Sequence, residues 1–192
     1  MQELKDRIVK EGKVLPGNII KVDGFLNHRI DTELMDHIAE EFGKHFNMDE
    51  VSMILTAEAS GIALSAVVAH HFHKPMIFAK KAKSDNIEGG LYQSDIFSDT
   101  YKKKVTLLVS KEWLSSDDKV LIIDDFMANG EAMRGLCDIV EKAGASLVGI
   151  GCAVEKGFQG GGDRLRAAGV NLKSLAIIES AEPGNIVFRE DT

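Results

Sequence analysis

The chain carries its most informative pattern at Val120-Leu121-Ile122-Ile123-Asp124-Asp125-Phe126-Met127-Ala128-Asn129-Gly130-Glu131-Ala132, where an apolar run leads into an acidic pair and a turn of small residues. Four apolar residues without alternation predict a strand that is buried on both faces, as in a parallel sheet covered by helices. Residues 131–143 have helical periodicity and are followed by Gly144, which predicts a helix end. The acidic pair is therefore expected at the carboxyl end of a strand, where open α/β sheets bind their ligands.

Strands and helices alternate along much of the chain. Short apolar runs predict strands at 52–56, 75–79, 105–109, 147–154 and 175–178. Helical periodicity is found between them, at 62–71, 131–143 and, as a short helix, 164–168. This order predicts an α/β fold with a mainly parallel sheet flanked by helices.

Two segments depart from this rhythm. The first 50 residues contain a helical pattern at 4–9, a hairpin predicted from 19–22 and 26–30 around Asp23-Gly24, and a helix from Thr32 to about His45 that Asp31 caps. We expect them to form a small lobe on a single domain of 1–192. Residues 80–104 are polar and rich in charge, and a loop of that length is expected to be a flexible lid.

Composition excludes several classes of protein. The 192 residues include 23 Lys and Arg and 30 Asp and Glu, and 23 − 30 = −7 argues against a protein that coats nucleic acid or anionic membrane. No apolar run approaches the roughly 18 residues of a membrane helix, and the charged start Met1–Arg7 indicates no signal peptide. Cys137 and Cys152 are too few for a disulfide framework, so we expect a cytoplasmic protein with buried thiols.

The acidic pair and the turn after it suit a phosphorylated sugar. The start of the helix offers free backbone N–H groups and the positive end of the helix dipole to a phosphate. Gly130 permits a close approach of the backbone, and the carboxylates of Asp124 and Asp125 accept hydrogen bonds from a diol. The structural alternative is an Asp-Asp loop in which Asn129 only caps the helix.

This segment resembles the signature of type I phosphoribosyltransferases, which bind 5-phosphoribosyl 1-pyrophosphate (PRPP). It departs from the commonest form, because Asn129 stands where Thr or Ser precedes the Gly and Ala132 stands near the end in place of Thr. The phrase 124–130 and the flanking Phe78-Ala79-Lys80-Lys81 and Lys111-Glu112-Trp113-Leu114 are similar to one branch, the bacterial xanthine phosphoribosyltransferases. The similarity extends over the whole chain and implies the type I phosphoribosyltransferase fold with a small hood formed largely by 1–50.

The resemblance assigns the PRPP site residue by residue. It implies that the turn cradles the 5′-phosphate and that Asp124 and Asp125, as catalytic residues, hold the ribose 2′ and 3′ hydroxyls. The phosphate-binding residues are Ala128, Asn129, Gly130, Glu131 and Ala132. The resemblance makes Thr56-Ala57-Glu58-Ala59-Ser60-Gly61 the pyrophosphate loop, with Ala59, Ser60 and Gly61 as binding residues. It also implies that Lys81 at the start of the flexible loop neutralises pyrophosphate. The alternative for Lys80-Lys81 is a solvated surface.

The resemblance also implies a purine site beside the hood. It places Lys156 on the 6-oxo oxygen and Ile20 and Asn27 near the 2-oxo edge. Phe158 is expected either to stack on the purine or to pack in the core. A cationic donor at the 6-position favours oxo-purines over adenine, whose amino group is itself a donor.

The expected reaction is transfer of 5-phosphoribosyl from PRPP to N9 of xanthine, with Mg²⁺ bound together with PRPP or pyrophosphate. The resemblance implies a homodimer, with a tetramer as the alternative, and the acidic net charge argues against a nucleic-acid or membrane partner. Guanine, hypoxanthine or adenine as the base, and a PRPP-sensing regulator without turnover, remain alternatives. The histidines of His70-His71-Phe72-His73 follow a helix, and no carboxylate or Cys pattern beside them predicts a metal site.

Overall fold

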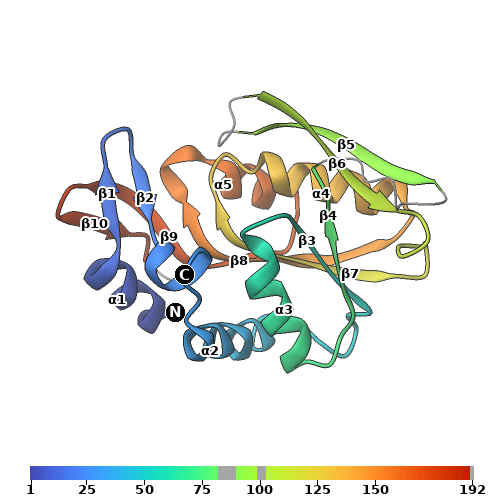
Figure 1. The fold of residues 1–192 in the computed structure, drawn as a ribbon, viewed down its shortest axis with the longest axis horizontal. Helices are drawn as coiled ribbons and strands as arrows, with labels where there is room; N and C mark the ends of the chain where they lie inside the picture. The colour runs from blue at the N-terminus through green and yellow to red at the C-terminus, as the bar shows by residue number, and fades with distance from the viewer. Residues whose placement is uncertain (82–89, 99–102, 191–192) are drawn as a thin grey trace.

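A six-stranded sheet forms the centre of the computed structural model, which describes residues 1–81, 90–98 and 103–190 (Figure 1). The strand order is β10-β9-β8-β7-β3-β4. The strands are β3 (Met53–Ala57), β4 (Met76–Ala79), β7 (Lys119–Met127), β8 (Ser146–Lys156), β9 (Leu172–Glu182) and β10 (Asn185–Phe188). All neighbours pair in parallel except β10, which is antiparallel to β9. The mainly parallel sheet predicted from the sequence is confirmed, and β10 is an addition to it.

The central strand β7 is longer than the four apolar residues that predicted it. It pairs with β3 on one side and with β8 on the other, and the β8 pairing continues through Asp124, opposite Cys152, to Met127, opposite Glu155. Asp124 and Asp125 therefore belong to the end of the strand itself. Strand geometry fixes their backbone and turns their side chains toward opposite faces.

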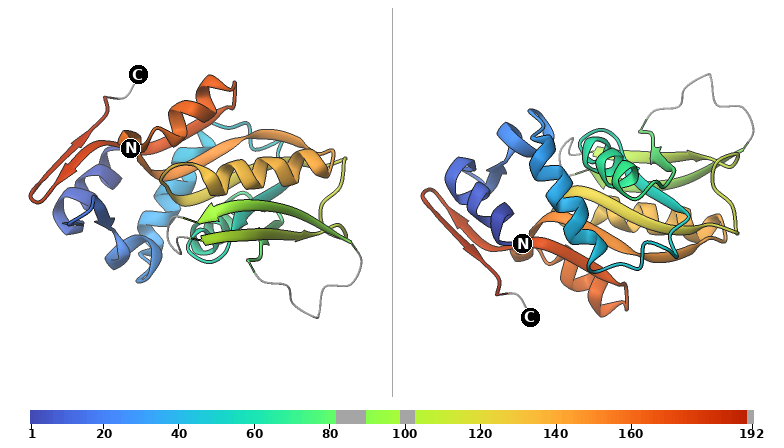
Figure 2. Two further views of the ribbon diagram at one scale, coloured as in Figure 1. Left: turned by 90° about the horizontal axis from the view of Figure 1, so that it is seen from above. Right: turned by 90° about the horizontal axis from the view of Figure 1, so that it is seen from below.

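Helices cover both faces of the sheet (Figure 2). On one face lie α2 (Thr32–Gly43) and α3 (Gly61–His71), whose apolar side chains share a core with β7, β8 and β9. On the other face lie α4 (Glu131–Lys142) and α5 (Gly161–Ala167). The predicted N-cap of α2 is confirmed, because the side chain of Asp31 accepts a hydrogen bond from Leu34 N at 3.2 Å.

The hairpin near the N-terminus forms at a different place from the predicted one. It consists of β1 (Lys13–Leu15) and β2 (Ile19–Lys21), and its turn contains Gly17 and Asn18, both with positive φ. Asp23–Asn27 is a single helical turn, η1, where the prediction had a turn at Asp23-Gly24 followed by a strand at 26–30. The helical turn buries the consecutive side chains of Phe25 and Leu26 together, whereas a strand would direct them to opposite faces.

The hood expected from residues 1–50 divides between two parts of the molecule. The helix α1 (Gln2–Glu11), the β1–β2 hairpin and η1 stand beside β9 and β10, at the left of Figure 1. The amino group of Met1 anchors this part by donating to the carbonyl oxygen of Leu175 at 2.6 Å. The helix α2 instead packs against α3 as part of a layer that covers the sheet.

The segment 80–104, predicted to be one flexible loop, contains regular structure. Its residues form β5 (Leu91–Ser98) and the start of β6 (Lys103–Ser110), an antiparallel hairpin that lies against α4. Alternation explains the error: Ser94 and Ile96 are buried, whereas Gln93, Asp95 and Phe97 are exposed, so the strand has no continuous apolar run. Residues 82–89 and 99–102 of the predicted loop lie outside the described residues.

Candidate active site

The acidic pair is buried at the end of β7. Asp124 is 7% exposed and Asp125 is 1% exposed, and the backbone N–H of Asp125 donates to Oδ1 of Asp124 at 3.0 Å. Burial raises the pKa of Asp124 well above its usual range, and the neighbouring charge of Asp125 raises it further. Oδ1 of Asp125 is buried without a hydrogen-bond partner among the described residues. An acceptor in this state suits a hydroxyl or cationic ligand.

The turn after β7 presents the N-terminus of α4 to the same place. Gly130 has φ 82°, which lets the chain reverse into the helix, and Oδ1 of Asn129 accepts a hydrogen bond from Glu131 N at 3.1 Å. Gly130 is the N-cap residue of α4, and the side chain of Asn129 binds the first N–H of the helix from the position before the cap. This contact occurs together with a helix terminus suited to a phosphate. From α5, Nη2 of Arg164 donates to the carbonyl oxygen of Asn129 at 2.8 Å and holds the turn from behind.

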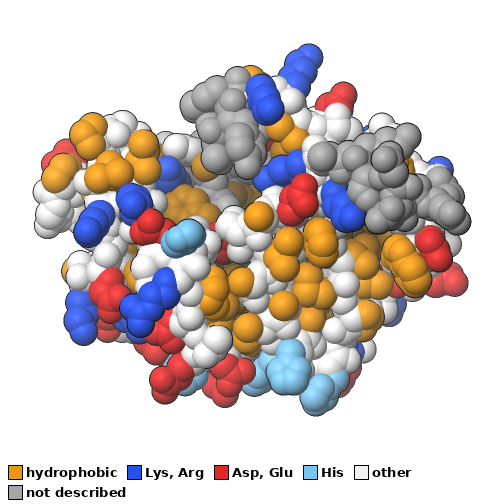
Figure 3. All heavy atoms as spheres, in the orientation of Figure 1, with side chains coloured by type: hydrophobic (Ala, Val, Ile, Leu, Met, Phe, Trp, Pro, Cys, Tyr) orange, Lys and Arg blue, Asp and Glu red, His pale blue; other side chains and the backbone are white. Residues whose placement is uncertain are grey.

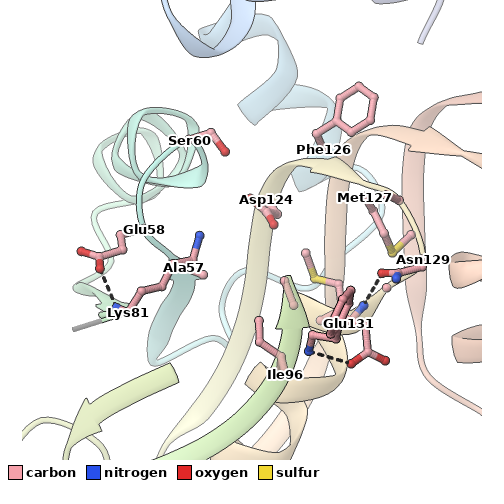
Figure 4. A pocket seen from close by; sticks show the side chains of 15 residues that line it. Ala57, Glu58, Ser60, Lys81, Ile96, Asp124, Phe126, Met127, Asn129 and Glu131 are labelled. Carbon is pink, nitrogen blue, oxygen red and sulfur yellow. Dashed lines mark hydrogen bonds between the residues drawn. The ribbon is translucent and has the colours of Figure 1, made fainter. Parts of the chain in front are cut away.

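The loop after β3 faces this turn across a cavity of about 150 Å³ (Figure 4). Asp124 lies between them, with Ser60 and Lys81 on one side and Asn129 on the other. The loop contains a cis peptide between Glu58 and Ala59. Glu58 accepts a hydrogen bond from the backbone N–H of Lys81, which connects the loop to the end of β4.

The described lining of this cavity includes most of the predicted PRPP site. The predicted members are Ser60, Lys81, Asp124, Ala128, Asn129, Gly130, Glu131 and Ala132. Gly61 directly follows Ser60 of this lining, and only a glycine fits at its position. A Cβ there would lie 2.3 Å from Oγ1 of Thr56 and 2.4 Å from Oδ1 of Asp124. Glu58, which belongs to the predicted pyrophosphate loop, also lines the cavity. Ile96 and Phe97 line it too and were not predicted, because the hairpin that supplies them was interpreted as a loop.

A larger cavity of about 1150 Å³ opens beside the β1–β2 hairpin, where Figure 3 shows the molecule hollowed. It brings together Ile20 and Asn27 from the N-terminal part, Asp125 from β7 and Lys156 from β8. Nδ2 of Asn27 donates to Oδ2 of Asp125 at 2.8 Å. Three of the four predicted base-site residues therefore share one cavity with a carboxylate of the acidic pair.

The fourth predicted base-site residue, Phe158, packs against the hydrophobic core and is not among the lining residues of this cavity. The alternative of core packing, raised from the sequence, therefore describes its position. The aromatic side chain in the cavity is Phe126, whose ring centroid lies 5.4 Å from Nζ of Lys156. Phe126 directly follows the acidic pair, and this position in the motif is the sequence signal from which its place in the cavity could have been predicted.

Residues 24–168 match the model of the phosphoribosyl transferase domain family. The chain belongs to this family. A xanthine phosphoribosyltransferase of Bifidobacterium adolescentis is 52% identical over 192 residues, which cover 98% of this chain and 100% of the relative. A xanthine phosphoribosyltransferase of Lachnoclostridium phytofermentans is also 52% identical, over the full length of both chains.

Solved structures show the same fold in more distant proteins. An adenine phosphoribosyltransferase from Giardia lamblia, complexed with 9-deazaadenine, has a TM-score of 0.77 and 21% identity, covering 93% of this chain and 98% of the other. One from Rhodothermus marinus has a TM-score of 0.74 and 20% identity, covering 93% and 100%. The fold predicted from the signature, the type I phosphoribosyltransferase fold, is confirmed.

A buried ionic network lies next to Lys156 on β8. Glu155, next to Lys156 on β8, is fully buried and accepts hydrogen bonds from Arg166 at 2.7 and 3.1 Å and from the hydroxyl of Ser174. A Cβ on Gly162 would lie 2.1 Å from Oε1 of Glu155, so α5 can approach β8 this closely only through a glycine. The carboxylate thus joins β8, β9 and α5 directly behind the cavity.

The histidine tract lies away from both cavities, at the end of α3. Nδ1 of His71 lies 2.8 Å from Oδ1 of Asp36 on α2. In the parts of the chain that the structure describes, no group of three or more His, Cys, Asp and Glu side chains is arranged to hold a metal ion. Within those same parts, no helix has the length and apolar character needed to cross a membrane.

Proposed function

We propose that this phosphoribosyltransferase transfers the 5-phosphoribosyl group of PRPP to N9 of xanthine and releases xanthosine 5′-monophosphate and pyrophosphate. One observation carries the proposal: the acidic pair stands between the phosphate-binding turn of α4 and the cavity that contains Lys156 and Asn27. A sugar phosphate in the smaller cavity and a purine in the larger one would meet at Asp124 and Asp125. Relatives of the same length that are xanthine phosphoribosyltransferases support the choice of base.

In this proposal the protein binds and orients, and no side chain forms a covalent bond with the sugar. The bond between C1′ and pyrophosphate breaks toward an oxocarbenium-like state while N9 approaches C1′. The backbone amides of the turn and the side chain of Lys81 hold the phosphates. The carboxylates of Asp124 and Asp125 hold the ribose hydroxyls and favour the positive charge that develops on the sugar.

The base is oriented from the other side. The ammonium of Lys156 donates to the 6-oxo oxygen, and the ring of Phe126 offers an apolar face to the purine. The proposal includes Mg²⁺ bound with PRPP, which supplies positive charge to the leaving pyrophosphate. Buried carboxylate oxygens, including Oδ1 of Asp125 with no partner among the described residues, fit the oxygen ligands that Mg²⁺ prefers.

A homodimer in the cytoplasm is part of the same proposal, as the family resemblance implies. An exposed apolar surface beside the edge strand β4 supports the dimer. Trp113 is 61% exposed and Phe78 is 38% exposed, and both line a cavity of about 480 Å³. In Figure 3 hydrophobic side chains gather over α3 and β4. Surface of this kind is typical of protein contacts.

A panel of purines tests the proposed function. The protein is incubated with PRPP, Mg²⁺ and xanthine, guanine, hypoxanthine or adenine, and both pyrophosphate release and the nucleotide product are measured. We expect the highest kcat/KM with xanthine and the lowest with adenine. Turnover of another base without turnover of xanthine would contradict the substrate, and PRPP binding without turnover of any base would indicate a regulator.

A further inference from the structure

The proposed phosphate site contains an acidic side chain. Glu131 is the first residue of α4 and lines the smaller cavity together with Asn129 and Gly130. The N-terminus of a helix attracts any anion within its reach, a carboxylate as well as a phosphate. A Glu131 carboxylate turned into the cavity would therefore compete with the 5′-phosphate of PRPP for the same backbone N–H groups, and its charge would repel the phosphate.

Two neighbours hold this carboxylate toward the β5–β6 hairpin. Arg134, one turn further along α4, donates to both of its oxygens, from Nη2 to Oε2 at 3.0 Å and from Nε to Oε1 at 3.3 Å. The backbone N–H of Phe97 on β5 also donates to Oε2, at 3.4 Å (Figure 4). These hydrogen bonds, first of all the one from Arg134, lower the pKa of the Glu131 carboxyl. The negative charge is therefore present in the site at neutral pH, and Arg134 neutralises it.

Arg134 is itself attached to the hairpin. Its Nη2 donates to the carbonyl oxygen of Asp95 at 2.9 Å, so one planar guanidinium holds the carboxylate and the strand together. The side chain of Arg134 is 52% exposed and that of Glu131 is 31% exposed. An ion pair this open to water contributes little to folding stability. Its main effect is to fix where the carboxylate lies relative to the cavity.

We propose that Arg134 is a positioning residue for PRPP, because it holds the Glu131 carboxylate out of the place that the 5′-phosphate takes. Without Arg134 the carboxylate turns to the N-terminus of α4 and acts as an internal competitor of the phosphate. The inference rests on the proposed function, of which it needs the PRPP site and not the identity of the base. It differs from a purely structural role in one respect: the loss of Arg134 matters only while residue 131 is charged.

The substitution Arg134→Met, made in the parent protein and in the variant Glu131→Gln, tests this difference. In the parent it should raise the KM for PRPP about tenfold, with kcat and the KM for xanthine changed less than about threefold. In the Glu131→Gln background the same substitution should change the KM for PRPP less than about twofold. Arg134→Lys keeps a cation within reach of Glu131 and should recover most of the loss. An equal or larger rise in the Glu131→Gln background would overturn the inference, because Arg134 would then act by holding β5 in place.

Lys142→Met is the matched control for contact with the hairpin. At the far end of α4, Nζ of Lys142 pairs with Oδ2 of Asp138 at 2.7 Å and donates to the carbonyl oxygen of Gln93 on β5 at 2.7 Å. It thus holds the same strand by the same kind of contact, away from the cavity. Its loss should change the KM for PRPP less than about twofold. A rise as large as that in Arg134→Met would overturn the inference.

Product-like inhibitors locate the effect within the PRPP site. Ribose 5-phosphate carries the 5′-phosphate alone, whereas pyrophosphate is expected at the loop 56–61 and Lys81. In Arg134→Met the inhibition constant of ribose 5-phosphate should rise about tenfold and that of pyrophosphate less than about threefold. The opposite order would overturn the inference. A parent protein that makes no nucleotide from PRPP with any purine would instead overturn the proposed function.

Discussion

Gly161→Ala should damage the proposed phosphate site from outside it. Gly161 begins α5, and a Cβ at this position would lie 2.5 Å from the carbonyl oxygen of Ala128, 2.5 Å from the carbonyl carbon of Asn129 and 2.7 Å from the backbone nitrogen of Gly130. All three atoms belong to the backbone of the turn that precedes α4. A backbone cannot rotate out of the way as the end of a flexible side chain can, so the turn or α5 must move.

The size of the movement follows from these distances. Ordinary van der Waals contact begins at 3.4 Å, so the closest pair is about 0.9 Å too near. Overpacking of this kind typically costs about 1–3 kcal/mol of folding free energy. For a chain of this size that corresponds to a Tm lower by roughly 2–12 °C. A displacement of about 1 Å in a substrate-holding group costs roughly 100-fold in rate.

The assay compares kcat and the KM values for PRPP and xanthine, together with Tm. We expect kcat/KM for PRPP to fall roughly 100-fold, with a smaller change in the KM for xanthine, because the affected turn faces the phosphate cavity. Gly24→Ala is the matched control: a Cβ there meets nothing within 4 Å and its φ is not in the positive region. If Gly161→Ala has the Tm of the parent protein, the argument for the steric clash is wrong; if its Tm falls while the kcat/KM for PRPP is unchanged, the assignment of the turn to phosphate binding is wrong.

Three further predictions test other parts of the site. Lys156→Ala should lower kcat/KM for xanthine about 10- to 100-fold through loss of a charged hydrogen-bond donor, with the KM for PRPP little changed. If binding of PRPP were weakened as much as the use of xanthine, Lys156 would not belong to the base site. Arg166→Met leaves the buried carboxylate of Glu155 without its cation. The free energy of unfolding, measured with urea, should fall by about 3 kcal/mol, a value at the low end for a buried ion pair because Arg166 itself is 30% exposed. A free energy of unfolding within 0.5 kcal/mol of the parent protein, roughly the level of a surface substitution, would contradict this prediction. Asp124→Asn should raise Tm, and the difference in Tm from the parent protein should grow as pH rises. The pKa of Asp124 is raised in the folded state, so the parent protein loses stability as pH rises toward that pKa. The asparagine of the variant does not titrate and loses none. A gain in Tm that shrinks as pH rises would refute the sign.

The order of elements around β7 could be predicted because it depends on local patterns. Apolar runs without alternation identified five strands of the central sheet, but the run at 105–109 lies in β6 of the separate antiparallel hairpin. The sequence Ile123-Asp124-Asp125 placed the acidic pair at the end of the central strand. Helix periodicity and the Asp31 cap located α2 in the same way. Such signals are contained in a window of about ten residues, so they do not depend on the rest of the fold.

The errors occurred where two patterns competed within one segment. Asp23-Gly24 is a frequent hairpin turn, but the turn forms at Gly17 and Asn18, and burial of Phe25 and Leu26 makes 23–27 helical. In β5 the alternation of buried and exposed residues was hidden because the whole segment 80–104, within which β5 lies, is polar and rich in charge. In both cases the outcome depends on which side chains the distant sheet and helices can bury, and composition does not contain that information.

The remainder of the site depends on contacts between segments that are far apart in sequence. Gly61 lets the loop after β3 reach Asp124, Gly161 lets α5 reach the turn before α4, and Gly162 lets α5 reach Glu155. Each glycine is needed because another part of the chain occupies the space of a Cβ, which no local pattern reveals. The net charge of −7 does not indicate whether the chain binds phosphate, because it too contains no information about these contacts between distant segments. Phosphate would be met by backbone amides that these close approaches hold in place and by Lys81, so the arrangement of the backbone, and not the overall charge, decides whether an acidic chain can bind a polyanionic substrate.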